Sequence, residues 1–166
     1  MLTYRAWDIE FRYPDNWRIS DQGDSILVAP DRGFVSGSLA YGMTIATFEP
    51  QSSRYFPRNS FAVPGVRPDT NTLTSATNQL INDLQESNPN MRVVRNSERT
   101  RVDGAQAMVV ELTNDSPLGG IETNRLVTVL RPNGLLRYFI GVAPQRDFSR
   151  YQPAFDQIVA SARFTD

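Results

Sequence analysis

Two strand–turn–strand patterns in the second half of the chain restrict its possible folds more than any other feature. Apolar and β-branched residues recur across Met91–Val102 and Ala105–Thr113, which flank Asp103-Gly104, and across Thr123–Arg131 and Leu135–Ala143, which flank Pro132-Asn133-Gly134. An Asp-Gly pair between two such runs is a strong signal for a tight β-hairpin. Hairpins join antiparallel strands, whereas parallel neighbours need long crossover connections. The sequence therefore predicts an antiparallel sheet.

Two of these strands should occupy different places in the sheet. Ala105–Thr113 is apolar on both sides, with Met108 facing one way and Val109 the other. Such a strand is typical of a central position that is covered on both faces. Met91–Val102 instead carries the charged residues Arg92, Arg95, Glu98, Arg99 and Arg101. Charge of this density favours a solvated edge strand, where it discourages unwanted pairing.

Shorter strands are predicted in the first part of the chain. Apolar runs lie at Trp7–Phe11, Trp17–Ile19, Ser25–Ala29 and Met43–Phe48, with turn residues between the first three and after the third. In the first run the large apolar residues alternate with acids, which is the period of a half-buried strand. Because Trp7 and Trp17 occupy strand positions, we expect both indole rings to pack in the core.

Two amphipathic helices are predicted to cover the sheet. Apolar residues recur at three- and four-residue spacing across Thr72–Ser87, and Asn88-Pro89-Asn90 ends this pattern. A second helix is predicted near Ser149–Ala162, with Pro153 in its first turn and Arg163-Phe164 as a short extension. The combination predicts an α+β fold, in which helices pack on the faces of an antiparallel sheet. A length of 166 residues suits one domain over residues 1–166.

The composition removes most catalytic chemistry. The chain has no His and no Cys, and all 17 of its basic residues are Arg. It therefore lacks the usual zinc ligands, the base of a Ser-His-Asp triad and the lysine of a Schiff base. We expect no enzymatic activity and no cofactor. A net charge of −1 also argues against a nucleic-acid partner, and no apolar run is long enough to insert into a membrane.

A long irregular stretch over residues 49–71 is the first candidate for a binding surface. It is rich in proline, and within it aromatic residues stand beside arginines, namely Arg54, Tyr55, Phe56, Arg58, Phe61 and Arg67. These residue types are enriched where proteins contact partners. They predict a contact with a protein or peptide, or with an anionic group. Alternatively, the stretch is a flap whose aromatic rings fill a gap in the core.

The loop between the two hairpins is the second candidate. It contains Asp115, Ser116, Gly119 and Gly120, and glycines allow the backbone to approach a ligand closely. Alternatively, the loop is a flexible connection. Four acids in predicted turns, Asp15, Asp21, Asp24 and Asp31, leave open a carboxylate-based glycoside hydrolase or a calcium site. The more ordinary expectation is that these acids cap turns.

Several long segments resemble a known family. Tyr4–Ile19, Ser36–Pro50, Leu80–Asn96 and Leu112–Phe164 are similar to the C-terminal domain that follows the catalytic domain in some bacterial zinc metallopeptidases. Those enzymes belong to the HExxH family that includes the CAAX prenyl-protease and HtpX/BepA-like peptidases. The Tyr13-Pro14 to Trp17 start, the central hairpins and the closing helix also resemble the PsbP-like fold, which implies an α/β/α sandwich.

The resemblance implies a non-catalytic accessory domain of a zinc-dependent metalloprotease. Because the chain lacks His, the HExxH motif of such a parent would lie outside it. The implied partner is a protein or peptide, namely the parent's catalytic domain or its substrate, and the implied parent is periplasmic or membrane-associated and faces outward. Two alternatives remain: a stand-alone PsbP-like assembly or lipoprotein-type factor, and a carboxylate-based enzyme or small-ligand binder.

Overall fold

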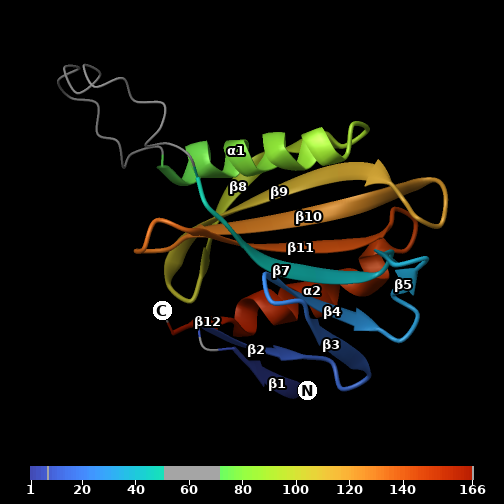
Figure 1. Cartoon of the computed structure of the whole chain (residues 1–166), viewed down its shortest axis with the longest axis horizontal. Coiled ribbons are helices and arrows are strands. Elements are labelled where there is room, and N and C mark those ends of the chain that lie inside the picture. Colours follow the sequence, from blue (N-terminus) through green and yellow to red (C-terminus); the bar gives the residue numbers. More distant parts are fainter. Residues whose placement is uncertain (7, 51–71, 166) are drawn as a thin grey trace.

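The computed structural model describes residues 1–6, 8–50 and 72–165. A seven-stranded antiparallel sheet forms the middle layer, and one long helix lies across one of its faces (Figure 1). The opposite face is covered by a second helix together with a small three-stranded sheet. The predicted α+β class and antiparallel pairing are therefore confirmed. The second covering layer is partly sheet, so the molecule is richer in strands than a balanced α/β/α sandwich.

The large sheet contains both predicted hairpins and three of the four predicted N-terminal strands. In spatial order its strands are β3 (Trp17–Asp21), β4 (Ser25–Pro30), β7 (Gly42–Phe48), β11 (Leu136–Pro144), β10 (Ile121–Leu130), β9 (Ala105–Asp115) and β8 (Arg92–Val102). The charged strand β8 lies at one edge, as its sequence predicts, and β9 lies next to it. The turn between them places Asp103 and Gly104 at φ values of 50° and 76°, the left-handed geometry that a type I′ hairpin requires.

The remaining strands are short. The small sheet has the order β1 (Leu2–Arg5), β2 (Ile9–Tyr13) and β12 (Arg163–Phe164), and β5 (Phe34–Val35) pairs with β6 (Ser38–Leu39). The predicted strand near the N-terminus corresponds to β2, and the predicted extension at Arg163-Phe164 is β12. Trp17 is only 7% exposed and packs in the core as expected, whereas Trp7 lies outside the described residues.

Strand register sorts the side chains of the sheet onto two faces. Leu126 of β10 stands beside Val110 of β9 and Ile140 of β11, whereas its neighbour Val127 stands beside Val109 and Phe139. Because successive residues of a strand point to opposite faces, the first set packs under one helix and the second under the other. Each set belongs to a separate cluster of buried apolar residues.

Helix α1 (Thr72–Ser87) has the bounds that its apolar stripe predicts, and it packs on β9, β10 and β11. Leu73, Ala76, Leu80 and Ile81 form the buried stripe. The helix is also joined to the sheet by a buried contact of 2.7 Å between the hydroxyls of Thr77 and Thr128.

Helix α2 (Phe148–Ser161) packs on β2, β7 and β11, with Phe155 and Ile158 buried. It begins at Phe148, so Pro153 is its sixth residue and lies in the second turn rather than in the predicted first turn. There the missing amide hydrogen removes one bond of the helix, which the buried face of α2 compensates. Neither helix in the described ranges has the length and apolar content needed to cross a bilayer.

Candidate functional site

A groove runs between α2 and the strands near the β8 edge of the sheet. It exists because α2 lies over β2, β7 and β11 and leaves part of β8, β9 and β10 uncovered on the same face. Its floor contains Met43, Val109 and Val127, and its helix side contains Phe155 and Val159. Its volume is about 190 Å³, enough for one or two apolar side chains rather than a large ligand.

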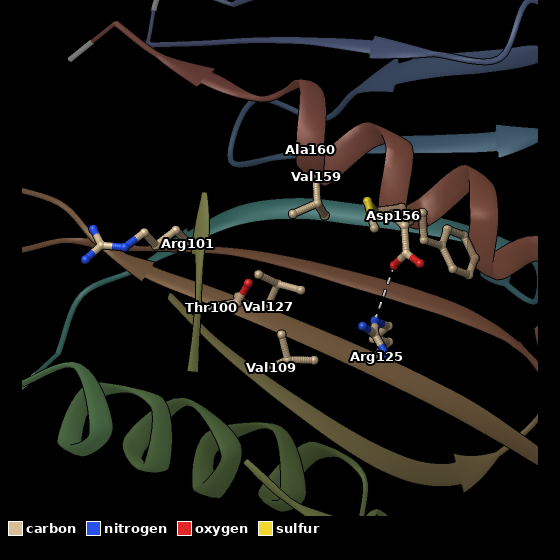
Figure 2. Close-up of a pocket in the computed structure, with 10 residues that line it drawn as sticks. Thr100, Arg101, Val109, Arg125, Val127, Asp156, Val159 and Ala160 are labelled. Atoms are coloured by element: carbon tan, nitrogen blue, oxygen red, sulfur yellow. Dashed lines mark ion pairs between the residues drawn. The ribbon is translucent and has the colours of Figure 1, made fainter. Parts of the chain in front are cut away.

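Charged side chains stand at the mouth of this groove. Arg125 of β10 points towards Asp156 of α2, and Arg125 Nε lies 3.5 Å from Asp156 Oδ1 (Figure 2). The side chain of Arg125 is 29% exposed and that of Asp156 is 53% exposed, so water weakens the pair. Arg101 of β8 also lines the groove, and its side chain extends away from this ion pair (Figure 2).

The groove has the chemistry of a binding surface. Its polar groups are Thr100, two arginines and one carboxylate that already has a cationic partner. An arginine does not ordinarily act as a base. An aliphatic floor with charged residues at its rim suits an apolar side chain flanked by polar groups of a partner.

The loop after β9 also lies beside a hollow. Gly119 and Gly120 line it together with Arg146, and its volume is about 390 Å³. Ser116 holds the turn from within: its amide donates to the Gly120 carbonyl at 2.9 Å, and its carbonyl accepts from the Gly119 amide at 2.9 Å. Asp115 accepts a hydrogen bond of 2.6 Å from Asn90. These four predicted residues thus lie together, and ligand binding by them stays a prediction.

The other predicted sites are placed differently. Arg54, Tyr55, Phe56, Arg58, Phe61 and Arg67 lie outside the described residues. Two of the four turn acids lie apart, since Asp15 pairs with the N-terminal amine and Asp31 with Arg18. The other two, Asp21 and Asp24, line the same hollow beside Arg137, and Asp21 accepts a hydrogen bond from Tyr4 there. Within the described ranges, no three His, Cys, Asp or Glu side chains group as metal ligands would.

One buried polar pair was not predicted from the sequence. Glu122 and Asn124 of β10 are almost fully buried on the α1 face, and Asn124 Nδ2 donates a hydrogen bond of 2.6 Å to Glu122 Oε2. Burial raises the pKa of Glu122, and the hydrogen bond from Asn124 opposes this effect. A signal was present in the sequence, because Glu122 and Asn124 occupy the same alternate positions as the buried Leu126.

Comparison with known proteins identifies the fold but not a family. No protein-family model matches the chain, and no curated protein matches it. The metallopeptidase parent implied by the sequence resemblance therefore gains no support from either comparison.

Two solved structures share the fold over almost the whole chain. One is the cyanobacterial PsbP protein CyanoP from Synechocystis, with a TM-score of 0.62, 14% identity, and coverage of 98% of this chain and 91% of that one. The other is LpqN from Mycobacterium tuberculosis, which is involved in cell envelope biogenesis, with a TM-score of 0.61, 15% identity, and coverage of 95% and 83%. The chain therefore has a PsbP-like fold.

Proposed function

We propose that the chain is a non-catalytic binding domain that holds a protein partner at the groove between α2 and strands β8–β10. The groove's aliphatic floor carries the proposal, because the half-buried Val109 lies next to the buried Val127, beside charged side chains that could orient a partner. The lack of His, Cys and Lys supports a binding role over catalysis. The similarity to CyanoP and LpqN supports it by fold alone.

Peptide selection can test the groove directly. The full chain would be panned against a random-peptide phage library, and selected peptides titrated into isotope-labelled protein. We expect amide shift changes around Val109, Val127 and Val159, and we expect Val109→Arg to abolish binding because it places a long cation over the floor. Ile121→Arg is the matched control, since Ile121 is exposed on β10 and does not line this groove.

Two results would contradict the proposal. Selected peptides that shift residues elsewhere and ignore Val109→Arg would move the binding surface away from the groove. If panning yields no peptide that binds the unaltered chain better than it binds Val109→Arg, the reason to assign the groove a role is gone. Circular dichroism of each variant separates loss of binding from loss of fold.

The finer form of the proposal is that this binding domain belongs to a zinc metalloprotease and contacts its catalytic domain or substrate. Its support is the segment resemblance of Tyr4–Ile19 and Leu112–Phe164. The complete open reading frame tests it: an HExxH helix encoded in the same gene would support the metalloprotease context, and a gene without one would contradict it. The groove experiment does not depend on this outcome.

A further inference from the structure

The outer edge of strand β8 is open to solvent. Strand β8 pairs with β9 on one side, and no described strand pairs with its other side. Every residue of Arg92–Arg101 whose side chain is described is exposed. An edge strand of this length presents a row of unpaired backbone donors and acceptors, to which another extended chain can add.

Only part of this edge is regular. The pairing of β8 with β9 shifts register between Val93 and Arg95 and again between Arg95 and Glu98. Such irregularities bend an edge and interrupt further pairing. From Glu98 to Val102, by contrast, each residue pairs in turn with Val109 to Ala105. An added strand would therefore find its ladder at Glu98–Val102.

Both faces of the sheet are hollowed beside this edge. On the α2 face, Thr100 lines the groove with the Val109 and Val127 floor. On the α1 face, Ser97 and Val93 line a second hollow of about 480 Å³ with Ile81 and Met108. Since side chains of an extended chain alternate between faces, an added strand could direct side chains into both hollows.

The charge of the edge indicates what kind of strand would add. Strand β8 carries four arginines and one glutamate. Arg99 Nη2 donates to Thr74 Oγ1 at 2.8 Å and Arg101 Nη1 donates to the Gly104 carbonyl at 2.9 Å, and neither has a carboxylate partner among the described residues. Their pairing with Met108 and Gln106 places both on the α1 side of the strand, two residues apart. Acids at alternate positions of an incoming strand would match this spacing.

We propose that Glu98–Val102 binds an extended partner segment in which acidic and apolar residues alternate, by strand addition to the β8 edge. The acids pair with Arg99 and Arg101, and the apolar side chains enter the groove over Val109. This inference rests on the proposed function, and it specifies how the partner binds and which residues the partner carries. A second copy of this chain is a poorer occupant, because two β8 edges side by side would bring arginines against arginines.

Synthetic peptides test the proposal. A fluorescein-labelled peptide of alternating Asp and Val would be titrated into the full chain, alongside a peptide of the same composition in which the Asp and Val residues form separate blocks. We expect only the alternating peptide to bind. We expect the double variant Arg99→Glu, Arg101→Glu to raise the Kd of the alternating peptide by about tenfold or more. The double variant Arg32→Glu, Arg150→Glu should leave this Kd unchanged. Arg32 and Arg150 are exposed and lie outside β8, which makes them the matched control.

Backbone methylation separates strand addition from simple groove binding. Two versions of the peptide would carry N-methyl groups on alternate sets of amides. Only one set of amides in an added strand points at β8, so one version should lose binding and the other keep it. Equal binding by both versions, or equal loss, would overturn strand addition.

The outcomes for the two proposals can be told apart. Phage-selected peptides that need Val109, combined with an alternating peptide that does not bind, would leave the groove proposal intact and reject strand addition. A concentration-dependent dimer in analytical ultracentrifugation that dissociates on Arg99→Glu would assign the edge to a second copy and reject the acidic partner. Loss of both peptide classes on Val109→Arg, together with the methylation asymmetry, supports both.

Discussion

Thr77 of α1 and Thr128 of β10 share a hydrogen bond whose direction the surroundings determine. Thr77 Oγ1 donates its single hydrogen to the Leu73 carbonyl at 2.7 Å, so in the 2.7 Å contact between the two hydroxyls Thr128 must be the donor. Both side chains are fully buried. The two residues are therefore not equivalent, although they look symmetric.

Removing either hydroxyl should expose this asymmetry. Thr77→Val removes the acceptor and leaves the Thr128 hydroxyl with no partner among the described residues, which should cost about 1–3 kcal/mol of unfolding free energy. Thr128→Val leaves Thr77 bonded to Leu73 and should cost less, about 1 kcal/mol. Urea denaturation of both variants and of the double variant measures the difference. Equal losses for the two single variants would contradict the assigned direction.

The buried pair of Glu122 and Asn124 should make stability depend on pH. Burial raises the pKa of Glu122 above its ordinary 4.5, so its protonated form is favoured in the folded chain. The stability linked to this group is thus fully present below the pKa of the unfolded chain and is lost as pH rises through the folded value. Above that folded value the folded chain contains a buried carboxylate, while Asn124 Oδ1 accepts no hydrogen bond in the described structure.

Glu122→Gln should therefore stabilise the chain at a pH above the raised pKa of Glu122, by about 1 kcal/mol, because it keeps the shape and removes the buried charge. The gain should shrink as pH falls towards 4.5, where the unaltered carboxyl is protonated. Thermal melts of both proteins across this range measure it. Glu86→Gln, at an exposed position on α1, is the control and should shift stability little at any pH. A Glu122→Gln variant that gains no stability over the unaltered chain as pH rises would contradict the effect of the buried charge.

Gly141 of β11 lies against the ring of Phe155 from α2. A Cβ atom at position 141 would stand 2.5 Å from Phe155 Cδ2, which is closer than carbon atoms pack. Gly141→Ala should therefore push α2 off the sheet and cost about 1–3 kcal/mol. The double variant Gly141→Ala, Phe155→Leu should be less destabilised than the sum of its two parts, since a smaller side chain makes room. Additive losses in chemical denaturation would show that this contact does not limit the packing of α2.

The sequence predicted the elements whose residues form a local pattern, such as an apolar stripe or a turn pair. The stripe from Leu73 to Leu84 set the bounds of α1, and Asp103-Gly104 set the hairpin of β8 and β9. The strands β1, β5 and β6 were not predicted, because runs of two to four residues have too little pattern of their own and form where a partner strand lies alongside. Pairing across the fold, rather than propensity, creates them.

The candidate groove could not have been predicted in this way. Val109 and Val127 look like core residues in the sequence, and they line a groove only because α2 rests on β2, β7 and β11. Where a helix lies on a sheet depends on packing contacts between elements, such as that between Phe155 of α2 and Gly141 of β11, which no local pattern encodes. The exposed edge at β8 was predictable, since its charges lie on both sides of one strand.

Tyr4 and Asp21 join the small sheet to β3 and should give an alkaline titration that can be followed by absorbance. Tyr4 Oη donates a hydrogen bond of 2.7 Å to Asp21 Oδ2, and this bond, together with burial, raises the pKa of Tyr4 to about 12. The folded chain therefore holds the phenol proton more tightly than the unfolded chain does. The stability linked to Tyr4 is present below its ordinary pKa of 10.0 and is lost as pH rises from there to about 12.

In Asp21→Asn the phenolate of Tyr4 should form closer to pH 10.0, because the carboxylate that held the proton is gone. Tyr4→Phe identifies which phenolate signal belongs to Tyr4, and an unchanged titration in Asp21→Asn would show that burial alone sets its pKa.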